Sequence, residues 1–166
     1  IQTDPDPAYN NHLQLIDAQG GSFTVSNSNE LSGNWLEKGE NGCLCFDYKA
    51  NWNYSLSYIT SVPKMAIFNH IGNPTNSLSG VHAYFVGHPG DPQIPFNTWK
   101  KYCLPVGLSV GNNLPSNTFG TWRIQNGSTV LTGAAGAAEW DNLIQNISGI
   151  FLSSDYTASP SEEISF

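Results

Sequence analysis

The sequence predicts an all-β protein, a β-sandwich of two antiparallel sheets with one short helix at about residues 134–146. Short stretches of alternating apolar and polar residues recur along the chain, with turn-forming residues about every ten positions between them. Charged residues make up only 11% of the 166 residues, and there are 16 glycines and 10 prolines, a composition that favours short strands and loops. No linker divides the chain, so we expect a single domain over residues 1–166.

The first half of the chain begins with a lead-in, residues 1–10, which contains two Asp-Pro steps. Alternating apolar residues follow, in stretches that end at a glycine pair, at prolines or in asparagine-rich segments, all of which favour turns. We expect strands at residues 12–18, 22–27, 43–49, 55–61, 64–71 and 81–87.

The second half continues with a strand over residues 98–108 and a hairpin over residues 121–133 that turns at Asn126-Gly127. The helix follows, because apolar residues recur at helical spacing in an alanine-rich context. Those residues are Trp140, Leu143, Ile144 and Ile147. Strands at residues 149–156 and 163–166 complete the chain, and we assign Trp35, Trp122 and Trp140 to the core.

The charge balance excludes several classes of partner. The net charge is −7 and the chain holds only six lysines and arginines, whereas nucleic acids and anionic lipids require clustered basic residues. There is no apolar run long enough to span a membrane, so we expect no membrane insertion. Few lysines, many asparagines and serines and a possible disulfide together favour an extracellular location.

Four segments in order carry the motifs of a known family. Residues 10–37 have an Asn lead, a strand that ends in Asp, a glycine pair and a close on Gly33-Asn34-Trp35. CLCFDYK has the form L-x-F-D-apolar, NTWKKYCLPVGL has Trp followed by alternating apolar residues and Pro, and residues 140–166 read helix, strand and loop. In this combination the chain resembles the laminin B (laminin type IV) domain in its bacterial, secreted form. The last strand of that family runs further than Phe166, so we expect it to be truncated here.

The resemblance implies a jelly-roll β-sandwich, similar to many carbohydrate-binding modules, with a non-catalytic role in adhesion, matrix contact or polysaccharide binding. It implies no cofactor, although some sandwiches of this shape hold a structural Ca²⁺ between the first and last strands. Asp17, Glu162 and Glu163 are the carboxylates at those places, and Ca²⁺ prefers oxygen ligands.

Aromatic and polar residues beside two strands suggest a ligand site. Sugar rings stack their C–H surfaces on aromatic rings, while charged and amide side chains hydrogen-bond the hydroxyls. The interpretation that competes with it is that Trp52 and Trp99 cover the edge of the core. The candidate residues for ligand binding are Trp52, Tyr54, Trp99, Lys101, Asp47 and Lys49.

We expect no catalytic residues. Residues 107–111 match the G-x-S-x-G pattern, but a loop follows Ser109 instead of a helix, and all four histidines precede it. No histidine spacing indicates a metal, and no pair of carboxylates indicates a glycosidase.

The three cysteines favour a disulfide over a metal or redox site, because Cys-x-Cys with one distant partner has neither metal-ligand nor thioredoxin-type spacing. Strand alternation puts Cys43 and Cys45 on the face opposite Leu44, Phe46 and Tyr48. It also puts Cys103 on the non-core face of its own strand. If the two strands are neighbours, the bridge is Cys45–Cys103 or Cys43–Cys103, and one thiol stays free.

The function we predict is a non-enzymatic extracellular recognition module that binds glycan through one face or the loops of the sandwich. Two alternatives remain open. The chain is a structural or adhesion domain that contacts extracellular protein partners, or it is an accessory domain of a carbohydrate-active enzyme.

Overall fold

The computed structural model describes residues 14–17, 23–26, 31–38, 42–50, 61–69, 80–92, 94–95, 97–153 and 162–165. Of residues 14–17, 23–26, 38 and 162–165 it describes the backbone alone. The lead-in at residues 1–10 and all but the last residue of the strand expected at 55–61 lie outside these ranges.

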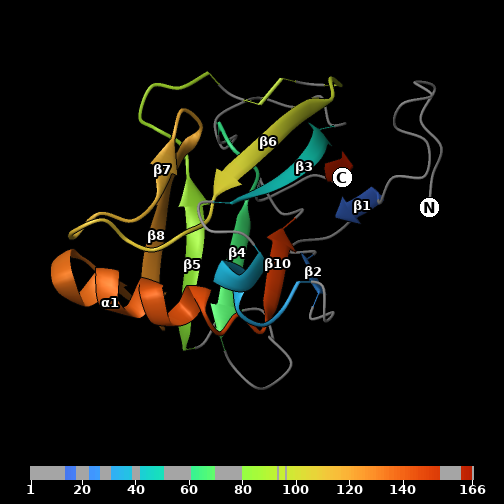
Figure 1. The fold of residues 1–166 in the computed structure, drawn as a ribbon. Helices are drawn as coiled ribbons and strands as arrows, with labels where there is room; N and C mark the ends of the chain where they lie inside the picture. The colour runs from blue at the N-terminus through green and yellow to red at the C-terminus, as the bar shows by residue number, and fades with distance from the viewer. Residues whose placement is uncertain are drawn as a thin grey trace.

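The described strands form two antiparallel sheets, shown in Figure 1. A four-stranded sheet has the order β1-β11-β3-β6, and a seven-stranded sheet has the order β2-β10-β4-β5-β8-β7 with β9 on β8. Together with one short α-helix, these sheets confirm the predicted all-β sandwich. The strands are β1 (Gln14–Asp17), β2 (Phe23–Ser26), β3 (Cys43–Ala50), β4 (Met65–Asn69), β5 (Val81–Val86), β6 (Lys100–Pro105), β7 (Ser116–Asn117), β8 (Gly120–Asn126), β9 (Thr129–Leu131), β10 (Gly149–Ser153) and β11 (Glu162–Ser165).

The core lies between the sheets and confirms the predicted faces. Tyr48, Tyr102 and Leu104 from the four-stranded sheet are at most 1% exposed. The three tryptophans assigned to the core, Trp35, Trp122 and Trp140, are all buried. Side chains of this size each contribute about 1.5–3 kcal/mol when fully buried, so the apolar alternation of the strands accounts for much of the stability.

The helix α1 (Gly133–Ile144) lies across the ends of β8 and β5 (Figure 1). Gly136 lets it approach β9, because a Cβ atom there would lie 2.8 Å from the carbonyl oxygen of Leu131. The helix ends two residues before the expected boundary. Ile147, expected on the helical face, is instead buried by a β-bridge to Gly33, with backbone bonds of 2.7 and 3.0 Å.

The Gly33-Asn34-Trp35 motif forms the start of a short 3₁₀ helix, Trp35–Lys38. Gly33 has a φ of +92°, which glycine adopts without strain. The Asn34 side-chain oxygen accepts a hydrogen bond from the Leu36 backbone N–H at 3.0 Å, and its amide donates to Glu37 at 3.0 Å. Asn34 therefore caps the helix that brings the Trp35 ring into the core.

The hairpin of β8 and β9 is confirmed, but its turn lies one residue later than expected. Asn126 pairs with Thr129, so Gly127 and Ser128 form the loop. Gly127 has a φ of +55°, the conformation for which glycine is favoured at the first loop position of a tight hairpin.

Strand β6 lies at an edge of the four-stranded sheet, and its outward carbonyl groups are bound by side chains from elsewhere in the sandwich. Every second residue of the segment 103–107 uses its carbonyl in this way. The side-chain amide of Asn117 donates to the Cys103 carbonyl at 2.6 Å. The indole N–H of Trp122 donates to the Pro105 carbonyl at 2.7 Å, and that of Trp140 donates to the Gly107 carbonyl at 2.8 Å. These bonds tie β6 to β7, β8 and α1.

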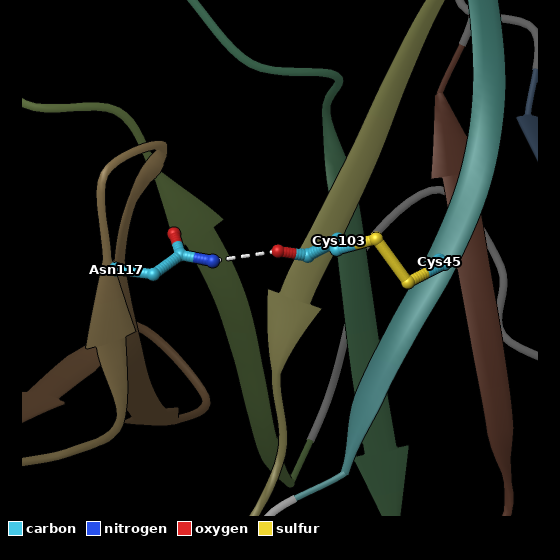
Figure 2. Close-up of a disulfide and its surroundings, with 3 residues drawn as sticks. All are labelled: Cys45, Cys103 and Asn117. Carbon is cyan, nitrogen blue, oxygen red and sulfur yellow. Dashed lines mark hydrogen bonds between the residues drawn. A yellow bond between two sulfur atoms is a disulfide. The ribbon is translucent and has the colours of Figure 1, made fainter.

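The disulfide joins Cys45 to Cys103, which decides between the two predicted pairings (Figure 2). The two residues are partners in the β3–β6 register, and their Cα atoms lie 4.1 Å apart. That approach is typical of a non-hydrogen-bonded pair, in which the backbone groups point away from the partner strand. Accordingly, the Cys103 carbonyl points to Asn117 in Figure 2. Cys43 is exposed and free, which agrees with the prediction that one thiol stays free.

We predict that replacing both Cys45 and Cys103 by alanine lowers the free energy of unfolding by about 3–4 kcal/mol, because the bridge closes a loop with a sequence separation of 58. Urea denaturation measures this loss. Cys43→Ser is the matched control and should change stability by less than about 0.5 kcal/mol. A thiol assay on the denatured protein should find one free thiol, and three would contradict the bridge.

Candidate functional site

The outer face of β3 and β6 brings together four of the six predicted ligand-binding residues. Asp47 and Lys101 are partners in the strand register, next to the Cys45–Cys103 pair. The ammonium of Lys49 lies 5.6 Å from the centre of the Trp99 ring, a cation–π contact. Lys101 is exposed, and the other three side chains are half-buried. The four side chains therefore form one partly exposed polar and aromatic surface.

The other two predicted residues, Trp52 and Tyr54, lie outside the described residues, so their part in this surface stays a prediction. The competing interpretation is that Trp52 and Trp99 cover the edge of the core, and the structure tests it for Trp99 only. That side chain is half-buried and is not among the buried residues of the core, which leaves part of the indole accessible to a ligand.

Positive charge is concentrated on this strand pair. Of the six lysines and arginines in the chain, Lys49, Lys100 and Lys101 lie on β3 and β6, which carry one carboxylate, Asp47. Lys100 lies on the inner face of its strand, and its ammonium is 5.0 Å from the centre of the Tyr102 ring and 5.7 Å from the centre of the Phe119 ring. The strand pair is therefore locally cationic in a chain whose net charge is −7.

Tyr102 lies directly beneath this surface, on the core face of β6. The residue is fully buried, and its hydroxyl makes no hydrogen bond with a described residue. Burial raises the pKa of Tyr102 to about 12, because a phenolate is poorly solvated in the core. Its ring packs against Phe46 and Phe119, so it supports the site by packing.

The proposed calcium ligands lie on strands whose backbone alone is described. Asp17 and Glu162 are partners in the β1–β11 register, while Glu163 pairs with Ile16. Among the side chains that the structure describes, no group of three or more histidine, cysteine, aspartate or glutamate residues could hold a metal ion. The calcium site stays a prediction.

The G-x-S-x-G segment forms a structural contact. The backbone N–H and the hydroxyl of Ser109 both donate to the Asp141 carboxylate of α1, at 2.7 and 2.9 Å. The hydroxyl proton is thus held by a carboxylate that also accepts a second bond. This contact joins the segment after β6 to the helix, and sequence spacing carries no signal for it.

The two described histidines are single polar residues on separate elements. His82 is 4% exposed within β5, and its ring nitrogens contact the Gly80 carbonyl and the Gln125 side chain at 3.0 and 3.2 Å. His88 lies in a turn and contacts the Asn117 carbonyl at 2.8 Å. His12 and His70 lie outside the described residues.

An apolar hollow of about 550 Å³ lies at the ends of β4, β5 and β10 and was not predicted. Its walls come from residues 61–66, 84–87, 151 and 153, three separate parts of the chain that no local motif marks. A mostly apolar wall has few partners for hydroxyl groups, so this hollow suits a sugar less well than the surface of β3 and β6.

The fold and the surface define a β-sandwich with one partly exposed aromatic and charged sheet face. No family model, curated protein or solved structure matches the chain. The likeness to the laminin B domain therefore stays an expectation from the motifs. In the part of the chain that the structure describes, no helix is long and apolar enough to cross a membrane.

We predict that the shifted ionisation of Tyr102 lowers the free energy of unfolding as the pH rises from 10 to 12. The unfolded chain ionises this tyrosine near pH 10, whereas the folded chain holds it neutral to about pH 12. The stability that depends on a neutral Tyr102 is therefore complete below pH 10 and is lost as the pH rises from 10 to 12. Relative to Tyr102→Phe, the free energy of unfolding should therefore fall by about 2 kcal/mol between pH 9 and 11.5.

Urea denaturation of both proteins at a series of pH values measures this difference. The phenylalanine variant keeps the packing and lacks only the ionisable hydroxyl, so it corrects for the other tyrosines and for Cys43. A difference that stays constant from pH 9 to 11.5 would show that Tyr102 ionises normally in the folded protein.

Proposed function

We propose that this protein is a non-catalytic extracellular recognition module that binds glycan on the outer face of β3 and β6. The observation that supports it is the grouping of four side chains on one sheet face, with the Lys49 ammonium over the Trp99 indole and Asp47 opposite Lys101. An aromatic ring beside charged donors and acceptors suits a ligand that has both C–H surfaces and hydroxyl groups.

In this proposal each side chain has one task. A sugar ring packs against the accessible part of the Trp99 indole. Lys49, whose ammonium already lies 5.6 Å from the ring centre, donates to hydroxyl or acidic groups of the same sugar. Asp47 accepts from hydroxyls, and the exposed Lys101 donates at the neighbouring position. No step of this binding requires a catalytic group or a cofactor.

The surface is held in place before the ligand arrives. β3 and β6 pair over six registered positions, and the Cys45–Cys103 bridge joins them beside Asp47 and Lys101. A surface that is already ordered loses less conformational entropy on binding, which raises affinity. The bridge also supports the extracellular setting, because disulfides persist in oxidising compartments.

We predict that Trp99→Ala weakens binding to a retained polysaccharide by about tenfold, because the stacking surface is lost. A glycan array followed by affinity chromatography on soluble and insoluble polysaccharides identifies the ligand and measures the loss. Trp52→Ala tests the second predicted aromatic residue in the same assay. Thermal denaturation of each variant verifies that it is folded.

Lys101→Gln should also weaken binding, whereas Lys64→Gln is a matched control at the apolar hollow and should not. Unchanged binding by folded Trp99→Ala and Lys101→Gln proteins would place the site elsewhere. If no glycan is retained and extracellular proteins bind instead, the chain is an adhesion domain.

A further inference from the structure

A second hollow, of about 460 Å³, lies at the edge of the seven-stranded sheet beside the start of α1. It is formed because two short strands share one edge of β8. β7 pairs with residues 120–121 and β9 with residues 124–126, so neither strand pairs with Trp122 and Arg123. The hollow is walled by residues 112–114 on one side and by residues 130–133, 136 and 137 on the other.

The walls combine apolar and polar groups. Leu114, Val130 and Leu131 supply apolar surface, and amide, hydroxyl and guanidinium groups supply hydrogen-bonding atoms. Arg123 is the single ionisable side chain in the described lining, so the hollow holds a cation and no carboxylate. Its volume lies within the range of about 300–1,000 Å³ that small-molecule sites occupy.

The polar side chains that this hollow offers to a ligand, those of Asn112, Asn113, Arg123 and Thr132, are exposed. The side chains of Asn112, Asn113 and Arg123 make no hydrogen bond or ion pair with another described residue. Thr132 stands at the helix N-cap position, but its side chain makes no capping hydrogen bond. The turn that carries the two asparagines is ordered by backbone bonds of 3.0 and 3.2 Å between Val110 and Asn113. Ordered donors of this kind can be met by a ligand at little cost in entropy.

We infer that this hollow binds a sugar unit that carries an acidic group, a carboxylate or a sulfate. Arg123 binds the acidic group, because a guanidinium donates two parallel hydrogen bonds to such an anion. Asn112, Asn113 and Thr132 bind the hydroxyls, and the apolar wall meets the C–H surface of the ring. The choice of a sugar as the ligand rests on the proposed function. The location of the site does not, because the hollow lies on β8 and α1, whereas the proposed glycan surface lies on β3 and β6.

The test is a titration of the ¹⁵N-labelled protein with three defined probes. They are the trisaccharide of galacturonic acid, a sulfated chondroitin disaccharide and, as the neutral control, the trisaccharide of galactose. Calorimetry measures the affinities, and amide chemical shifts locate the site. We expect an acidic probe to shift the amides of residues 112–114 and 132–137, and the neutral probe to bind at least about tenfold more weakly. The two acidic probes tell a carboxylate from a sulfate preference.

Arg123→Gln should weaken binding of the acidic probe at least about tenfold, because a shorter, neutral amide replaces the charged guanidinium. Lys64→Gln, at the apolar hollow and on neither proposed sugar surface, is the matched control and should leave this affinity unchanged. Equal affinity for the neutral probe, or an unchanged affinity in Arg123→Gln, would overturn the inference.

The outcomes separate this inference from the proposed function. Shifts confined to β3 and β6 would overturn the second site and support the first. Shifts confined to residues 112–137, together with unchanged binding by Trp99→Ala, would overturn the first site and support the second. If neither acidic probe binds, the hollow is not a site for acidic sugars.

Discussion

The structure depends on how β6 satisfies its backbone at the edge of the four-stranded sheet. Even-numbered residues direct their backbone groups to β3, as the 2.9 Å bond from Val106 N–H to the Gly42 carbonyl shows. The carbonyls of Cys103, Pro105 and Gly107 point the other way and are bound by Asn117 and two indoles. A buried carbonyl left unpaired costs about 1–3 kcal/mol, so these bonds hold the two sheets and the helix in a single arrangement.

The same alternation produces the candidate glycan surface. The even residues of β6 send Tyr102 and Leu104 into the core, and the odd residues send Lys101 and Cys103 to the outer face. A shift of the register by one residue would exchange the two faces, which the buried tyrosine and the disulfide both prevent. Core packing and the hydrogen bonds at the sheet edge thus fix the register that places Lys101 opposite Asp47. No interaction between these two side chains is needed for that placement.

Strand alternation in the sequence predicts much of this: the buried faces of β3 and β6, one free cysteine, the core tryptophans and the β8–β9 hairpin. It could not choose between Cys43 and Cys45, because only the pairing register decides which one meets Cys103. Local propensity also misplaced the end of α1, where a long-range bridge to Gly33 takes Ile147 out of the helical pattern. The hollow beside Arg123 has no sequence signal, since it arises where two strands stop short on a third.

The distribution of charge bears on how such a chain meets an acidic glycan. A net charge of −7 repels polyanions at long range, yet three of the six basic residues lie on β3 and β6, and Arg123 lies at the second hollow. At physiological ionic strength the screening length is about 8 Å, so distant carboxylates contribute little once a ligand is in contact. Binding would then depend on the lysine and arginine side chains within reach of the sugar, whose attraction opposes the repulsion from the acidic rest of the chain. Such an arrangement favours short-range recognition of particular sugar groups over general attraction to polyanions.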